Sequence, residues 1–144
     1  MSDGVLHQAP TVDVSPGIVL PELRKQPITK VQLVKYAGAS GDYNLIHTDD
    51  ETARRVGLDG VIAHGMLSMA FLGQYLCWLF GPESVRRLRV RFHAMVRPGD
   101  KLTCCGLVKE INAHDGGRRV GLDVWVQNQR MERVTAGDAE VEVS

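Results

Sequence analysis

The chain lacks a net charge. Lys and Arg together number 17, as do Asp and Glu, so the formal charge is zero and the isoelectric point is near 7.0. Non-specific binding to nucleic acid depends on a positive field that such a chain does not have. We therefore expect no nucleic-acid partner.

Cysteine is scarce. The three thiols are Cys77, Cys104 and Cys105, and their spacing matches neither a CxxC pair nor a Cys/His zinc site. Residues 1–17 also lack the basic start and apolar run of a signal peptide. We expect reduced thiols, no metal and a cytoplasmic protein.

No internal repeat and no low-complexity linker divides the chain. Its 144 residues suit one domain, and a domain of this size buries roughly 68–70% of its unfolded surface without needing a disulfide. Residues 1–26 contain three prolines, so we expect a loose arm there, with a possible edge strand at residues 18–23. Residues 27–144 are expected to form the single domain.

Only one long apolar run is present, at residues 61–80. It is long enough to cross a bilayer, but it contains His64 and Gln74 and has no companion segment. A helix that a sheet covers on every side is also apolar all round. We interpret the run as a buried helix that opens at Gly65 and ends by Gly81, and we expect no membrane span.

Two shorter helices are expected before it, at residues 29–40 and 48–56. Each would open with a capping box, in which a threonine and a Gln or Glu three residues later satisfy each other's backbone N–H. Thr29 with Gln32 and Thr48 with Glu51 are these pairs. Helical spacing places the core face of the first helix on Val31, Val34 and Ala37.

After the apolar helix the period of the pattern changes to two, which indicates strands. The expected strands are residues 87–94, 101–112, 118–127 and 131–143. Glycines inside them predict bulges or bends at Gly106, Gly121 and Gly137. Strands and helices do not alternate, so the fold class is α+β: a curled antiparallel sheet wrapped around a long central apolar helix.

Polar side chains gather in the link between the two short helices. Asp42, Asn44 and His47 lie there, and a carboxylate with an imidazole can hold a water and move its protons. Each residue alone is typical of a turn or of a buried imidazole. Residues five apart do not share a helical face, so Asp42 and His47 need an irregular link to meet. The N–H of Gly65, at a helix start, can stabilise negative charge on a carbonyl oxygen.

Three motifs resemble those of the MaoC-like (R)-specific enoyl-CoA hydratases, especially the hydratase subunits of mycobacterial fatty-acid dehydratases. The motifs are residues 36–47 (YAGASGDYNLIH), residues 62–67 (IAHGML), and residues 90–92 followed by the RPGD turn at 97–100. Their order and spacing fit along residues 31–143. The resemblance implies a hot-dog fold, in which a curled antiparallel sheet wraps a central helix.

The resemblance also implies reversible hydration of trans-2-enoyl thioesters to (R)-3-hydroxyacyl thioesters. Asp42 and His47 would be the catalytic pair, and which of the two is the base is left open. Asn44 would orient them, and the Gly65 N–H would serve the thioester oxygen. No cofactor is implied, and no GxGxxG motif occurs. Two departures stand out: Leu45 replaces the proline of many members, and Ala70 replaces the helix serine of some relatives.

Further residues are candidates for substrate binding. His64 would contact the substrate or anchor the loop by a hydrogen bond, and Met66 would line the acyl chain. Arg91 would meet the phosphates of coenzyme A or of a carrier protein's phosphopantetheine arm, although a solvated strand face explains an arginine equally well. Because hot-dog sheet edges commonly pair, we expect a homodimer, with a heterodimer with a related hot-dog chain as the alternative.

Two other functions fit the same fold. A thioesterase usually carries an acid on the central helix, and residues 66–80 contain neither Asp nor Glu. A non-catalytic acyl-binding subunit of a heterodimer would not need to retain both Asp42 and His47. The sequence thus favours the hydratase.

Overall fold

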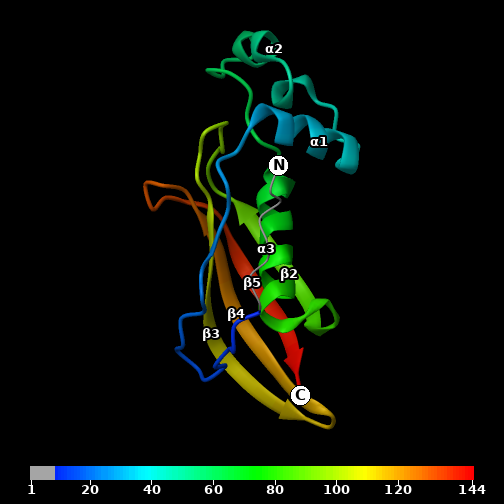
Figure 1. Ribbon diagram of the computed structural model, residues 1–144, viewed down its shortest axis with the longest axis vertical. Coiled ribbons are helices and arrows are strands. Elements are labelled where there is room, and N and C mark those ends of the chain that lie inside the picture. The colour runs from blue at the N-terminus through cyan, green and yellow to red at the C-terminus, as the bar shows by residue number, and fades with distance from the viewer. Residues whose placement is uncertain (1–8) are drawn as a thin grey trace.

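A five-stranded antiparallel sheet curls along one long helix, α3 (Gly65–Phe80), in the computed structural model, which describes residues 9–144 (Figure 1). The strand order is β1-β3-β4-β5-β2. The strands are β1 (Leu23–Arg24), β2 (Val85–Phe92), β3 (Thr103–His114), β4 (Gly117–Gln127) and β5 (Arg133–Val143). The other helices are α1 (Lys30–Ser40), α2 (Asp50–Arg55) and the 3₁₀ turns Leu45–His47 and Pro82–Ser84. The expected α+β hot-dog fold is confirmed.

Strand alternation sets the face that the sheet turns toward α3. Every second residue of β4 is buried, namely Val120, Leu122, Val124 and Val126. The β3–β4 hairpin turns at Asp115-Gly116, where Gly116 has φ of +96°. That conformation suits glycine because it has no Cβ.

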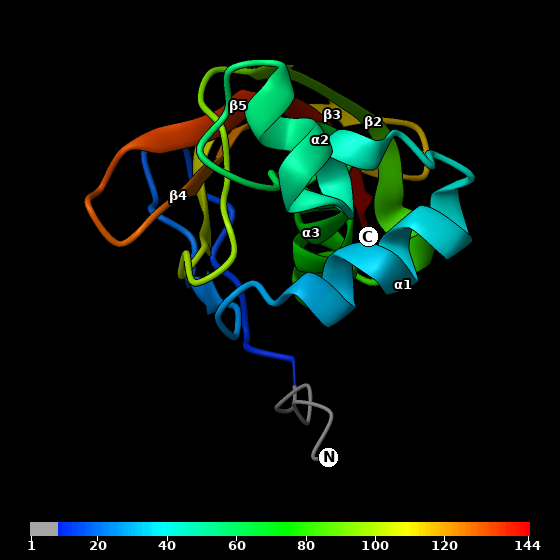
Figure 2. The same cartoon turned by 90° about the horizontal axis from the view of Figure 1, so that it is seen from above.

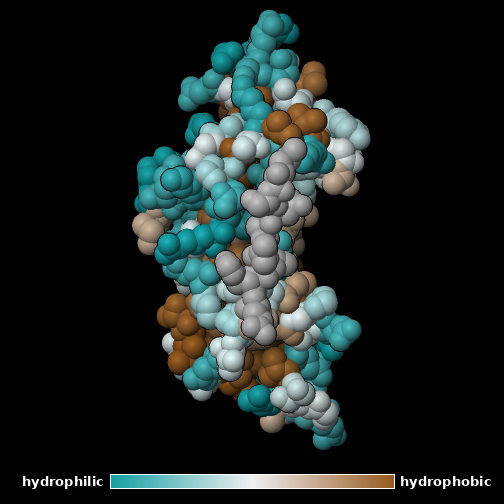
Figure 3. Space-filling view, viewed as in Figure 1, coloured by the Kyte–Doolittle hydropathy of each residue, from teal (hydrophilic) through white to brown (hydrophobic). Residues whose placement is uncertain are grey.

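The helix α3 is buried on its sheet side and open on another. Leu72, Tyr75 and Leu76 are fully buried, whereas Ala70 and Gln74 are exposed and Met66 is 52% exposed. The expectation of a helix covered on every side is therefore wrong for this face. Figure 3 shows further apolar surface near α1 and at the opposite end of the molecule. None of the helices in residues 9–144 combines the length and apolarity that a membrane span requires.

The two short helices lie around the start of α3, as the view from above shows (Figure 2). The expected cap of α1 is confirmed, since Thr29 accepts the N–H of Gln32 at 3.1 Å. The expected core face is wrong in part: Val31 and Val34 are 64% and 56% exposed, and Leu33 is buried in their place.

The helix α2 begins later than the sequence predicts. Its cap is Asp49, which accepts the N–H of Thr52 at 3.0 Å, rather than Thr48. Asp50 then ties the helix to its surroundings by pairing with Lys30 and accepting the N–H of Val61 at 2.9 Å. These contacts lower the pKa of the Asp50 carboxyl and fix the entry to α3.

Part of the expected loose arm is bonded to the sheet. The N–H of Gly17 donates to Val108 at 2.8 Å, and that of Leu20 donates to Gly106 at 2.9 Å. The ladder of β1 starts only at Leu23, because Pro21 has no N–H to donate. This strand lies at an edge of the sheet, and its bounds differ from the predicted residues 18–23. Residues 1–8 of the arm lie outside the described residues.

The three thiols are free. Cys104 and Cys105 are buried, and burial raises the pKa of the Cys104 thiol to about 12 and that of Cys105 to about 11. Both are therefore unreactive thiols at neutral pH.

The strand glycines have two separate roles. A register shift lies beside Gly121, between Val108 and Glu110, as expected for a bulge. Gly106 and Gly137 pair in regular register and instead allow close approach, because a Cβ on Gly137 would lie 1.8 Å from the carbonyl oxygen of Arg89.

We predict that Gly137→Ala lowers the free energy of unfolding by about 3 kcal/mol, because the added methyl forces β2 away from β5. Urea denaturation measures this change. Gly38→Ala is the matched control: this helical position has no atom within 4 Å of a new Cβ, and the substitution should raise stability by about 1 kcal/mol. Equal effects of the two substitutions would contradict the steric explanation.

Candidate active site

The loop after α1 is shaped by two consecutive side-chain-to-backbone bonds. Gly41 ends α1 in the left-handed conformation, with φ of 75°. Asp42 Oδ1 then accepts the N–H of Asn44 at 3.2 Å, and Asn44 Oδ1 accepts the N–H of Ile46 at 3.2 Å. Asn44 therefore shapes the main chain, because its side chain caps the 3₁₀ turn. The second carboxylate oxygen of Asp42, Oδ2, takes no part in these turn bonds.

His47 is held at the end of this loop in one tautomer. Its Nδ1 lies 2.7 Å from the carbonyl oxygen of Ile62, and since a carbonyl only accepts, Nδ1 carries the proton and Nε2 presents a lone pair. The N–H of Ile62 donates in turn to Ile46 at 3.1 Å. His47 is only 8% exposed. Its burial and its hydrogen bond to Ile62 together fix the orientation of the imidazole ring.

Asp42 and His47 meet across a short gap. His47 Nε2 and Asp42 Oδ2 are 3.7 Å apart. This separation is too long for a direct hydrogen bond, but one water oxygen can contact both atoms. The expected pairing of carboxylate and imidazole is present in the geometry.

His64 packs directly on the pair. Its Nε2 donates to the main-chain carbonyl of Asp42 at 3.1 Å, and its ring stacks on that of His47 with centroids 3.8 Å apart and planes 23° apart. Tyr36 meets the ring edge-on at 5.0 Å. Burial and the Asp42 carboxylate raise the pKa of the Tyr36 hydroxyl, so this neighbour remains a neutral phenol.

The first turn of α3 supplies a free donor next to His64. Within residues 9–144 the N–H of Gly65 makes no hydrogen bond, and His64 provides no side-chain cap. The start of a helix carries partial positive charge and binds anionic oxygen. Phe92 packs where a side chain on residue 65 would lie, with ring carbons 3.0–3.1 Å from an ideal Cβ, so any other residue there would require the Phe92 ring to shift.

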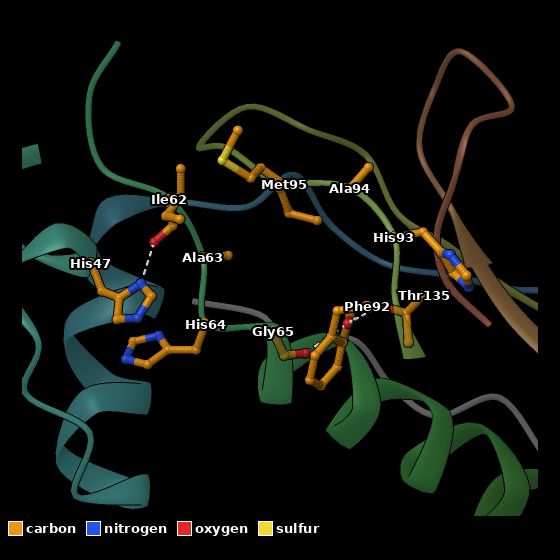
Figure 4. A pocket seen from close by; sticks show the side chains of 12 residues that line it. His47, Ile62, Ala63, His64, Gly65, Phe92, His93, Ala94, Met95 and Thr135 are labelled. Atoms are coloured by element: carbon orange, nitrogen blue, oxygen red, sulfur yellow. Dashed lines mark hydrogen bonds between the residues drawn. The ribbon is translucent and has the colours of Figure 1, made fainter. Parts of the chain in front are cut away.

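A cavity of about 430 Å³ connects these parts (Figure 4). Its lining includes His47, Gly65, Phe92, Ser68 and Thr135. The Ser68 and Thr135 hydroxyls are 2.6 Å apart, and Ser68 also donates to the carbonyl of Gly65 at 2.8 Å. The cavity thus brings together His47, the start of α3 at Gly65 and two buried hydroxyls.

The sequence prediction missed most lining residues of this cavity, among them Phe92, Ser68 and Thr135. Phe92 lies in the motif at residues 90–92, which carries only the family resemblance, and Ser68 lies unmarked within the apolar run at residues 61–80. Thr135 carries no local signal, because only the pairing of β5 with β2 brings it to α3.

Asp42, His47 and His64 also place one donor atom each within 4.8 Å of one another. Metal ligation requires in-plane imidazole lone pairs that converge on one point. Because the two rings are stacked, their lone pairs run side by side. The arrangement suits proton transfer rather than metal binding.

Two of the predicted binding residues lie away from the cavity. Met66 is half-exposed on the open side of α3. Arg91 lies on β2, where alternation points it to the face opposite Phe92, beside a hollow of about 530 Å³ next to Gly137. Its neighbours Arg87 and Arg89 are paired with Asp138 at 3.3 and 3.4 Å, whereas Arg91 forms no ion pair with the described part of the chain.

The curled sheet and the central helix define a hot-dog fold, with a cavity at the start of that helix. A family model for the MaoC-like domain matches residues 15–131, and the chain belongs to this family of (R)-hydratases and dehydratases. The expected family is confirmed.

Individual relatives agree with this membership. The beta subunit of fatty acid synthase from Aspergillus oryzae is 37% identical over 110 residues, which cover 74% of this chain and 5% of that protein. The R-hydratase PhaJ1 from Pseudomonas aeruginosa superimposes with a TM-score of 0.77 at 29% identity, covering 88% of this chain and 80% of that chain. The ChsH1–ChsH2 complex from Mycobacterium tuberculosis gives 0.79 at 20% identity, covering 92% and 100%, which shows the shared fold. The chain therefore spans only a small part of the synthase subunit.

Proposed function

We propose that the chain catalyses the reversible addition of water to trans-2-enoyl thioesters, giving (R)-3-hydroxyacyl thioesters. The observation that carries this proposal is the 3.7 Å separation of His47 Nε2 and Asp42 Oδ2 beside the free N–H of Gly65. Similarity to an R-hydratase at 29% identity supports the reaction class.

In the proposed mechanism a water held between Asp42 and His47 attacks C3 of the substrate. The proton leaving the water passes to the pair, for which Nε2 of His47 offers a lone pair, and the pair returns one proton to C2. The two groups act as one titrating unit. Dehydration of a 3-hydroxyacyl thioester is the same path reversed.

The Gly65 N–H would stabilise the thioester oxygen as it gains negative charge. It lies at the positive end of α3, where a donor needs no reorganisation when the charge develops. The cavity past Gly65 would hold the part of the thioester next to the reacting carbons, against Phe92. Arg91 remains the candidate for a phosphate of coenzyme A or of a carrier's pantetheine arm, reached around the edge strand β2.

A second hot-dog chain is the expected partner. The strand β2 is a sheet edge, and unpaired edges are sites where a second chain can pair. Several large apolar side chains are also exposed, as is usual at interfaces. These side chains are Tyr43, Leu45, Met66, Phe92 and Met95. A homodimer fits these features, and a heterodimer with a related chain is the alternative, as in the mycobacterial ChsH1–ChsH2 and HadBC complexes.

We predict that the purified protein removes the ultraviolet absorbance of the conjugated enoyl-CoA, because hydration destroys the double bond next to the thioester. The product should be the 3-hydroxyacyl-CoA, identified by mass, with no free thiol released. The assay is repeated with acyl chains of increasing length, from crotonyl-CoA upward. Light scattering gives the oligomeric mass of the assayed sample.

The rival functions give different products in the same assay. A thioesterase would release free coenzyme A and leave the double bond intact. A non-catalytic subunit would change neither signal at any chain length, and a monomeric mass would contradict the expected dimer. Loss of absorbance without thiol release is the only result that fits a hydratase.

A further inference from the structure

We propose that His64 is a positioning residue that aligns Asp42 and His47, an inference that rests on the proposed hydration. One side chain contacts both members of the pair. Its Nε2 donates to the main-chain carbonyl of Asp42 at 3.1 Å, and its ring face lies on that of His47 at 3.8 Å. Figure 4 shows the two rings lying against each other.

The contact with Asp42 ties an otherwise local turn to the core. The Asp42 side chain is 52% exposed, and its other hydrogen bonds run to residues two positions away, Ser40 and Asn44. Leu45 offers no proline ring to stiffen this loop. The bond from His64, which is 3% exposed, therefore anchors the Asp42 backbone to the buried residue that precedes α3.

The stack with His47 limits a different motion. The hydrogen bond from His47 Nδ1 to Ile62 fixes one atom of the ring, but rotation about that bond would swing Nε2 away from Asp42. The parallel face of His64 blocks this rotation. Because a displacement of about 1 Å can lower a rate by about 10²-fold, the stack bears directly on the water held by the pair.

One atom of His64 argues against a purely packing role. Its Nδ1 is buried and has no hydrogen-bond partner. Leaving a buried acceptor unpaired is unfavourable, and an apolar ring of similar shape would avoid it. The imidazole supplies what an apolar ring lacks, which is a donor at Nε2 together with a flat face.

Three substitutions separate the two contacts. His64→Phe keeps a ring without a donor, His64→Gln keeps a donor without a ring, and His64→Ala keeps neither. We expect kcat of His64→Ala to fall about 10²-fold with KM within about twofold, and the other two variants to give intermediate values of kcat. His114→Gln, on the exposed β3–β4 hairpin, is the control and should leave both constants unchanged.

A second measurement needs no turnover. In ¹⁵N spectra of the histidine rings, the wild-type protein should show His47 protonated on Nδ1 and His64 on Nε2. In His64→Ala the His47 signals should shift toward averaged values, because the ring is no longer held. Thermal denaturation establishes that each variant is folded.

The outcomes are distinguishable. Wild-type kcat in folded His64→Ala, a loss confined to KM, or unchanged His47 signals would each overturn the positioning role. If the wild-type protein hydrates no enoyl thioester but the His47 signals shift as expected, the positioning role stands and the proposed function fails.

Discussion

Asp42→Asn and His47→Asn are each expected to lower kcat for enoyl-CoA hydration by about 10²–10⁴-fold. Both substitutions are chosen to spare the loop. Asparagine at 42 still accepts the N–H of Asn44, a bond that Oδ1 makes at 3.2 Å. Asparagine at 47 can still donate to the carbonyl of Ile62, as Nδ1 does at 2.7 Å. What each variant loses is a group that takes or gives a proton at the shared water.

Steady-state kinetics with the ultraviolet assay measures these losses. The double variant should be little slower than the worse single variant, because groups that act as a unit are not additive. Asp59→Asn and His114→Asn are matched controls, since Asp59 is 93% exposed and His114 lies on a hairpin far along the sheet. Wild-type turnover in either site variant would rule out the water-holding pair.

The second large effect is expected from deleting the N–H of Gly65. Proline is well tolerated at the first position of a helix, where the N–H has no helical partner. The preceding His64 has ψ of 133°, a conformation that proline permits in its neighbour. Gly65→Pro should therefore remove the oxyanion donor and preserve α3, with a fall of about 10²–10³-fold in kcat.

The steric contact with Phe92 has to be removed first. A Cβ at residue 65 would lie 3.0 Å from the Phe92 ring, so both variants are made in a Phe92→Ala background. Gly65→Ala in this background adds the Cβ and keeps the N–H, and it is the comparison for Gly65→Pro. Circular dichroism confirms that both remain helical. Equal kcat in the two proteins would show that the N–H does not serve the thioester oxygen.

Local signals in the sequence were sufficient to predict most elements of the fold. The cap at Thr29, the end of the first helix at residue 40 and the helix that opens at Gly65 each depend on neighbours within one or two turns, and all three are confirmed. The cap of α2 was misplaced by one residue, because Thr48 and Asp49 are both good caps. The face of α1 was misjudged because Leu33 and Val34 are adjacent and equally apolar, and only the position of the sheet selects Leu33.

The site was predictable in its composition but not in its assembly. The approach of Asp42 to His47 follows from the loop between two capped helices, which the sequence shows. The stack of His64 on His47 and the packing of Phe92 on Gly65 join residues far apart in the chain. No periodicity or spacing reports such contacts, because they depend on how β2 and the loop before α3 are placed by the whole sheet.

Residues 62–65 determine which assays would detect a damaging substitution in this protein. Ile62 holds the His47 ring, His64 holds the Asp42 backbone, and Gly65 opens α3, yet none of the three belongs to a strand of the sheet. We expect substitutions of His64 to lower the proposed turnover in a chain that still expresses and folds. A survey of variants scored only by yield or thermal denaturation would pass them as harmless.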